Sequence, residues 1–336
     1  MALRIAINGF GRIGRCILRA LYERGLNGQL QVVAINEPAD CATMGYMLRY
    51  DSTHGRFQGE VSVAEDAMQV NGDHIAISHH TDITHLNWAA HNIDLVLECS
   101  GLYTSRDEVA LHLSRGAKRV LLSQPGDSDM DFTLIHGLNQ ADLDVSQRIV
   151  SNGSCSTNCV LPLLALLDAE FGIEQGVTTT IHSAMNDQPV IDAYHSDLRR
   201  TRAAVTSIIP VDTALPKGIA RLLPQLEGRF ESLHLRVPTL NVSAMDLSIQ
   251  LRRATDAQSI NALLLAQSKG ALKGILGYTD EPHASVDFNH DPRSGIVDAS
   301  QTRVSNGQLV KLLVWFDNEW GFANRMLDTA LLMAHR

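Results

Sequence analysis

The chain has 336 residues, 45% of them hydrophobic and 19% charged, with a formal net charge of -9. This length exceeds the usual single-domain size, so two domains are the default expectation. The negative charge and the dispersed arginines argue against nucleic-acid binding, and the longest apolar stretch is far too short to cross a bilayer. Five scattered cysteines and the lack of a signal-peptide pattern after Met1 favour the cytoplasm.

The first half of the sequence alternates strand patterns with helix patterns. Ser105 and Glu108 form a capping box that opens a helix ending at Gly116. Apolar residues also recur at helical spacing from Ile13 to Leu21. Short, continuously apolar runs indicate strands that are covered on both faces, at 3–7, 31–35, 95–97, 119–122, 132–135 and 148–150. This alternation predicts an α/β, doubly wound parallel sheet.

The pattern changes after about residue 155. Longer strands with partial alternation, at 176–181, 233–237, 242–251 and 309–316, predict a mostly antiparallel sheet accompanied by one helix at 256–268. A last helix at 322–335 is expected to pack back on the first domain. We therefore predict a first domain of residues 1–154 with the C-terminal helix 319–336, and a second, α+β domain of residues 155–318.

A glycine-rich turn follows the first strand and opens a helix. Gly9, Gly11 and Gly14 permit a tight turn and a close backbone approach, so a pyrophosphate can bind the amides at the helix start, where Arg12 and Ile13 lie. Glu37 ends the second strand about 20 residues on, where a carboxylate accepts hydrogen bonds from ribose hydroxyls and repels a 2′-phosphate. The pattern predicts a Rossmann domain that binds NAD; the alternative is an ordinary strand-to-helix turn.

Cys155 lies between a strand and an apolar helix. At a helix N-terminus the dipole and the free amides favour the reactive thiolate, so Cys155 is the candidate nucleophile. His182 closes the next long strand and could accept the thiol proton as a general base. Pro162 lies slightly deep for a first helical turn, so local irregularity is expected there. Cys159, one turn further along, is interpreted as a small core residue.

Other interpretations of these residues remain open. A histidine beside a serine is more often a plain surface or core residue, and His79, His80, His85 and His91 are interpreted as solvated. The zinc-type ligands Cys155, Cys159 and His182 have an unusual spacing, and no fourth ligand is evident. A cysteine phosphatase is disfavoured because no arginine follows Cys155 to close a phosphate loop.

Three blocks of sequence resemble the glyceraldehyde-3-phosphate dehydrogenase family over essentially the whole chain. They run from Ile7 to Arg15, from Ser154 to Cys159 and from Asp317 to Gly321. The resemblance implies that the cysteine of the second block is the nucleophile, here Cys155, and that His182 activates it. It also implies that Asn318 holds the nicotinamide carboxamide, that Ser123 and Thr81 lie near the cofactor, and that the enzyme is a homotetramer. No metal ion is expected at the site.

Departures from the glycolytic members resemble the erythrose-4-phosphate dehydrogenase branch. Met185 replaces a phosphate-binding threonine, and Ala214-Leu215-Pro216 replaces Gly-Ala-Ala. Thr81 replaces an arginine whose backbone approaches the adenosine, and Glu37 replaces an aspartate. The branch implies oxidation of D-erythrose 4-phosphate to 4-phosphoerythronate, which feeds pyridoxal 5′-phosphate synthesis. Water activated by His182 would resolve the Cys155 thioester, whereas inorganic phosphate attacks it in the glycolytic relatives.

The phosphorylated aldose substrate is expected to bind through arginine, whose fork matches phosphate oxygens. The candidate substrate-binding residues are Ser154, Ser156, Arg200, Thr213, Ala214 and Arg236. The alternative within enzymes is a phosphorylating glyceraldehyde-3-phosphate dehydrogenase of glycolysis. The alternative from another class is a nucleotide-sensing protein that keeps the fold without catalysis.

Overall fold

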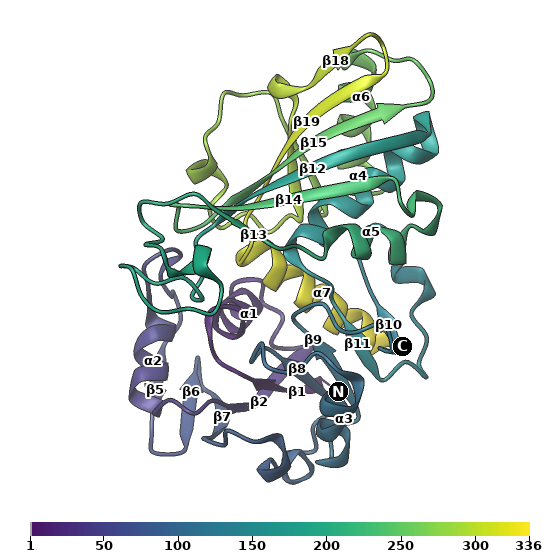
Figure 1. Ribbon diagram of the computed structural model, residues 1–336. Coiled ribbons are helices and arrows are strands. Elements are labelled where there is room, and N and C mark those ends of the chain that lie inside the picture. The colour runs from purple at the N-terminus through teal and green to yellow at the C-terminus, as the bar shows by residue number, and fades with distance from the viewer. Residues whose placement is uncertain (1) are drawn as a thin grey trace. The chain divides into compact units, whose positions relative to one another are not determined.

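Two sheets, each with its own helices, organise the chain (Figure 1). The computed structural model describes residues 2–336. Two compact units divide the chain: the first holds residues 1–135, 139–154 and 323–336, and the second holds residues 136–138 and 155–322. The first unit therefore takes the C-terminal helix from Ala323 rather than from residue 319, and a short segment at 136–138 belongs to the second unit.

The first unit is built on a nine-stranded sheet in the order β10-β11-β9-β8-β1-β2-β7-β6-β5. The strands from β10 to β7 pair in parallel, and β6 and β5 add an antiparallel edge. The central strands are almost fully buried because helices cover them, as their continuous apolar runs predict. The strands are β1 (Leu3–Asn8), β2 (Leu30–Asn36), β5 (Val61–Val63), β6 (Ala67–Val70), β7 (Asp73–Ser78), β8 (Leu95–Glu98), β9 (Arg119–Leu122), β10 (Phe132–Thr133) and β11 (Ile149–Ser151).

Four helices and a small hairpin complete this unit. Helix α3 carries the predicted capping box, since the Ser105 hydroxyl accepts from the Glu108 amide and the Glu108 carboxylate accepts from the Ser105 amide. The C-terminal helix is tied to the unit by Arg119, which donates to the Met333 carbonyl over 2.7 Å. The elements are α1 (Arg12–Glu23), α2 (Cys41–Arg49), α3 (Arg106–Ser114), α7 (Trp320–His335), β3 (Tyr50–Asp51) and β4 (Gly55–Arg56).

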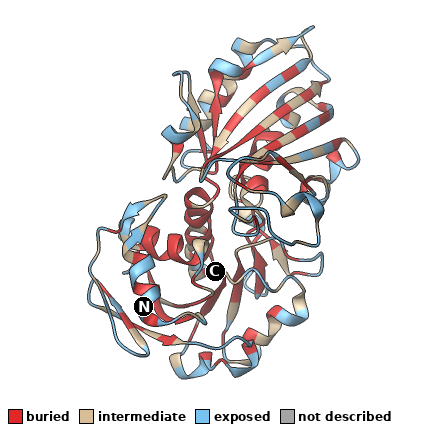
Figure 2. Ribbon diagram, turned by 60° about the vertical axis from the view of Figure 1, so that its left-hand side comes forward, coloured by how far each residue is buried: buried red, intermediate tan, exposed pale blue. Residues whose placement is uncertain are grey.

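The second unit is built on an eight-stranded mixed sheet in the order β13-β14-β12-β15-β19-β17-β16, with β18 paired to β19. Most pairs are antiparallel, while β12 with β14 and β16 with β17 are parallel. Buried residues alternate with intermediate or exposed ones along much of the long strands, as Figure 2 shows. The strands are β12 (Ile173–Ser183), β13 (Ile209–Val211), β14 (Phe230–Val237), β15 (Ser243–Leu251), β16 (Leu276–Thr279), β17 (Gly295–Asp298), β18 (Arg303–Ser305) and β19 (Leu309–Phe316).

The helices of the second unit are α4 (Cys155–Phe171), α5 (Leu215–Leu222) and α6 (Ala257–Lys269). Helix α4 runs without interruption through Pro162. The local irregularity expected at that residue therefore does not break the helix. Most of α4 is buried, including Cys159, which confirms the interpretation of that cysteine as a core residue. Among residues 2–336, no helix combines the length and apolarity needed to cross a bilayer.

Candidate functional sites

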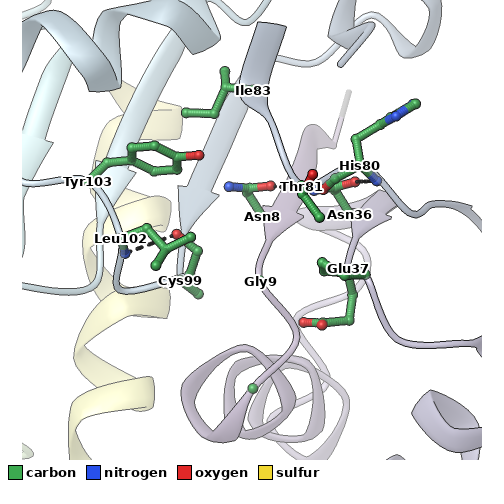
Figure 3. Close-up of a pocket in the computed structure, with 13 residues that line it drawn as sticks. Asn8, Gly9, Asn36, Glu37, His80, Thr81, Ile83, Cys99, Leu102 and Tyr103 are labelled. Carbon is green, nitrogen blue, oxygen red and sulfur yellow. Dashed lines mark hydrogen bonds between the residues drawn. The ribbon is translucent and has the colours of Figure 1, made fainter. Parts of the chain in front are cut away.

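A pocket opens where β1 ends at the glycine-rich turn. Its lining combines that turn with the ends of β1 and β2 and with the segments that follow β2, β7 and β8 (Figure 3). In Figure 3, Tyr103 and Leu102 lie on one side of Gly9, with Glu37 and His80 on the other. The lining residues are Asn8, Gly9, Gly11, Asn36, Glu37, Pro38, His80, Thr81, Ile83, Cys99, Ser100, Leu102 and Tyr103.

The glycines of the turn meet the steric demands of a dinucleotide cradle. A Cβ on Gly9, whose φ is +90°, would lie 2.5 Å from the Ser100 amide nitrogen, and one on Gly14 would lie 2.3 Å from the Gly9 carbonyl oxygen. A Cβ on Gly11 would meet no atom within 4 Å beyond its chain neighbours. Gly9 and Gly14 are therefore required by packing, whereas Gly11 leaves open space beside the pocket for a close-approaching ligand.

Glu37 lies in this pocket with its carboxylate turned to the glycine-rich turn. Its Oε2 accepts from the Phe10 amide over 2.7 Å, which fixes the carboxylate at the end of β2. Thr81 lines the same pocket, and Ser123 bonds to Cys99 at its wall. The residues present fit a dinucleotide with free ribose hydroxyls, because a 2′-phosphate would meet the Glu37 charge.

Arg12 makes a contact that the sequence does not reveal. Its guanidinium pairs with Asp51 in β3, and this pairing, against the effect of burial, lowers the pKa of the Asp51 carboxyl. Arg12 and Ile13 lie in the first turn of α1, outside the pocket lining. A contact from them to a pyrophosphate would therefore come from backbone amides rather than from the Arg12 side chain.

In the second unit, Cys155 is the first residue of α4 and His182 lies near the end of β12. Gly153, at φ +65°, makes the left-handed turn that leads into the helix. The Cys155 Sγ lies 3.7 Å from His182 Nε2, and His182 Nδ1 lies 2.8 Å from the Ser183 carbonyl oxygen. A carbonyl only accepts, so Nδ1 carries the proton and Nε2 presents its lone pair to the thiol.

Burial shifts the pKa values of both members of this pair. Desolvation raises the pKa of the Cys155 thiol, and the opposing effects of Ser156 and Arg236 are smaller. Burial also lowers the pKa of His182 to about 4. Both shifts favour a neutral thiol beside a neutral imidazole, so desolvation opposes the thiolate that the helix N-terminus is expected to favour.

Arg236 lies on β14, two residues beyond His234, and pairs with His182 of β12 in the sheet register. Its Nε donates to His234 Nε2 over 3.2 Å, and the His234 ring stacks on His182 with centroids 5.2 Å apart. Burial lowers the pKa of His234 to about 3, so it stays neutral and able to accept. The sequence offered no signal for His234 beyond alternation along the strand.

Arg200 and Arg236 are brought together by a shared partner. Asp187 Oδ2 lies 2.9 Å from Arg200 Nη1, and Asp187 Oδ1 lies 3.5 Å from Arg236 Nη1. Thr213 lies two residues beyond β13, which pairs with β14 at Arg236, and its hydroxyl accepts from the Leu215 amide at the start of α5. The predicted substrate residues Arg200, Arg236 and Thr213 thus come from neighbouring elements.

The remaining predicted residues stand as follows. Ala214 is the N-cap of α5 and offers no side-chain cap. Ser156 bonds to Cys155, and Ser154 directly precedes it. The Asn318 Oδ1 accepts from the hydroxyls of Ser183 and Ser243, at 3.0 and 2.9 Å. These two bonds fix the Asn318 amide, so its Nδ2 is the donor that it can offer to a carboxamide oxygen.

Comparison with known protein families decides the classification. Residues 3–106 match the glyceraldehyde 3-phosphate dehydrogenase NAD binding domain, and residues 154–318 match the glyceraldehyde 3-phosphate dehydrogenase C-terminal domain. The chain belongs to the glyceraldehyde 3-phosphate dehydrogenase family. It is an NAD-dependent oxidoreductase, with an NAD-binding first domain and the family's catalytic domain, and this family acts on phosphorylated aldehydes.

A buried polar network lies beneath the NAD pocket of this family member, and the sequence analysis missed it. Trp88 Nε1 donates to His112 Nδ1 over 2.9 Å, and His112 Nε2 lies 2.8 Å from Glu98 Oε2. Indole is only a donor, so His112 is neutral and donates its Nε2 proton to a Glu98 carboxylate. Glu98 also accepts from Asn8 and Ser100, two residues that line the pocket.

Proposed function

We propose that the chain oxidises D-erythrose 4-phosphate to 4-phosphoerythronate with NAD, through a thioester on Cys155 that water cleaves. The observation that carries this proposal is the 3.7 Å approach of Cys155 Sγ to a His182 Nε2 whose lone pair faces it. A thiol beside a neutral imidazole is a nucleophile with its base in place. NAD, when bound, accepts the hydride from the substrate carbon.

The residues of the chain account for the other steps. His182 takes the Cys155 proton as sulfur bonds to the aldehyde carbon, and the resulting oxyanion is stabilised by the Cys155 amide and by protonated His182. After oxidation of that carbon the sulfur is held as a thioester. His182 releases its proton to solvent and then removes a proton from the water that attacks the thioester carbon. The carbon–sulfur bond breaks, His182 returns this proton to the sulfur, and the acid leaves. Aldehyde, water and NAD thus give acid, NADH and a proton.

Met185 supports a four-carbon substrate. It stands where the glycolytic members carry a phosphate-binding threonine, and its side chain is 45% exposed after the end of β12. A thioether is a weak acceptor and has no proton to donate, so it forfeits a hydrogen bond worth about 1 kcal/mol. The proposal therefore places the substrate phosphate on Arg200, Arg236 and Thr213, with the Ser154 and Ser156 hydroxyls near the reacting end.

The proposal also covers the oligomeric state of the enzyme and its role in the cell. Large apolar side chains are exposed between β12 and β13, as a homotetramer contact would require: Val190, Ile191, Tyr194, Leu198, Val205 and Ile208. By resemblance to the erythrose-4-phosphate dehydrogenase branch, the product feeds pyridoxal 5′-phosphate synthesis in the cytoplasm.

The test follows NADH formation with erythrose 4-phosphate or glyceraldehyde 3-phosphate, each with and without inorganic phosphate. We expect preference for the four-carbon aldehyde and turnover without phosphate, and a Cys155→Ala variant should give none. Preference for the three-carbon aldehyde with an absolute need for phosphate would instead assign the phosphorylating reaction of glycolysis.

A further inference from the structure

Asp187 places a negative charge between the two arginines that the proposed function assigns to the substrate phosphate. One oxygen of its carboxylate faces Arg200 Nη1 at 2.9 Å and the other faces Arg236 Nη1 at 3.5 Å. A carboxylate that bridges two guanidinium groups uses donors that a phosphate would use. An incoming anion must therefore displace Asp187 or bind beside it against charge repulsion.

The Arg236 and Asp187 side chains differ in how freely they can move. The Arg236 side chain is only 9% exposed, its Nε is held by His234, and His234 stacks on His182. The Asp187 side chain is 36% exposed and lies in the segment between β12 and the short 3-10 turn Leu198–Thr201. The arginine is thus fixed in place, whereas the carboxylate can move toward water.

We propose that Asp187 determines specificity as an internal anion on the Arg200–Arg236 pair, one that the phosphate of a covalently held substrate displaces and free inorganic phosphate does not. The inference rests on the proposed function. Arg200 also pairs with Asp197 over 3.4 Å, so the two arginines and their two carboxylates are neutral together, and displacement of Asp187 leaves a net charge of +1 for a dianion. A substrate tethered to Cys155 competes at high effective concentration, an advantage that free phosphate lacks.

In this way Asp187 keeps free anions off the Arg200–Arg236 pair until the phosphate of a tethered substrate takes its place. Burial lowers the pKa of the Arg236 guanidinium, and the Asp187 carboxylate partly opposes that effect. The residue therefore stabilises the empty anion site while weakening its affinity for a free anion.

The experiment measures the dissociation constant of inorganic phosphate on the NAD-loaded full chain by calorimetry, at constant ionic strength and without aldehyde. Asp187→Asn should bind phosphate about tenfold more tightly or better than the parent. Asp187→Ser should do the same, which guards against a local effect of the asparagine. Asp192→Asn is the matched control, because it removes one charge from the same loop at a residue paired with Arg202 over 3.3 Å.

Equal affinities in the parent and both Asp187 variants would overturn the inference. A similar gain in Asp192→Asn would also overturn it, because the effect would then be one of general loop charge. Because no aldehyde is present, this result is independent of which sugar phosphate the enzyme oxidises. The proposed function is tested separately by the NADH assay, and it fails if turnover of the parent enzyme requires inorganic phosphate.

Discussion

The position of one proton on His182 determines what Cys155 can do. The Ser183 carbonyl holds that proton on Nδ1, so Nε2 is a ready acceptor 3.7 Å from the thiol. The pKa of His182, lowered to about 4 by burial, keeps this acceptor unprotonated across the physiological range. Since the thiol pKa is raised rather than lowered, reactivity depends on proton transfer during attack and not on a resting thiolate.

His182→Asn should slow alkylation of Cys155 by iodoacetamide at pH 7 by at least about tenfold, because general bases contribute factors of about 100 to 10,000. The rate should then rise steadily with pH as the thiol ionises unaided. The measurement is the alkylation rate between pH 6 and 10, with His283→Asn, a histidine bonded to Thr279, as the control. An unchanged profile in His182→Asn would contradict the proposed pair.

At the scale of elements, the Glu98 network joins β8 and α3 to the pocket-lining turns. Glu98 Oε2 receives the His112 and Asn8 donors, and Oε1 receives the amide and hydroxyl of Ser100. An amide in its place has a single acceptor oxygen, so two of these four donors would face an NH₂ group. Both Asn8 and Ser100 line the NAD pocket, so the network positions that pocket.

Glu98→Gln should therefore weaken NAD binding by about tenfold or more and reduce the free energy of unfolding by about 3 kcal/mol, as expected when a buried carboxylate loses its partners. The two quantities are measured by NAD titration and by urea unfolding. Glu65→Gln, at an exposed glutamate, supplies the control. Wild-type NAD affinity in a folded Glu98→Gln protein would show that the network does not position the pocket.

Local patterns in the sequence were sufficient to predict many of the helices and strands of the first unit. Strand β1, the glycine turn and the start of α1 follow from neighbouring residues, and so does the capping box of α3. Strands β5 and β6 were missed because a polar residue interrupts the apolar run of each, and β5 is largely exposed. The predicted strand at 132–135 shortens to Phe132–Thr133 for lack of further pairing.

The site was predictable only in part, for a related reason. Cys155, His182 and the glycines carry motifs, whereas Asp187, His234 and Glu98 act through contacts between residues distant in sequence. Asp187 and Arg236 are 49 positions apart, and Glu98 meets Asn8 across 90. No periodicity encodes such pairs, and chain order alone did not show that Asp51 pairs with Arg12.

At the scale of the whole molecule, two neutral imidazoles link stability to pH. Burial lowers the pKa of His182 to about 4 and that of His234 to about 3, while both have an ordinary value of 6.5. Between pH 6.5 and these lowered pKa values, the unfolded chain therefore binds protons that the folded chain does not bind. Their contribution to stability is complete above pH 6.5 and is lost as the pH falls toward 4.

Between pH 7.5 and pH 5 the free energy of unfolding should fall by a few kcal/mol, at about 1.4 kcal/mol for each unit of pKa shift. Urea unfolding at the two pH values measures this loss. His234→Gln should show a smaller loss than the parent, because only one of the two imidazoles remains. A pH-independent stability in this window would contradict the buried neutral pair.

The central claim is that Cys155 carries an acyl group which His182-activated water removes. Its most direct test is mass spectrometry of the His182→Asn protein, quenched with acid shortly after mixing with NAD and erythrose 4-phosphate. The account predicts an added acyl mass on the peptide that contains Cys155, formed slowly and cleared more slowly still, and no such mass in Cys155→Ala. NADH formation with no acyl mass on that peptide at any time would contradict the account.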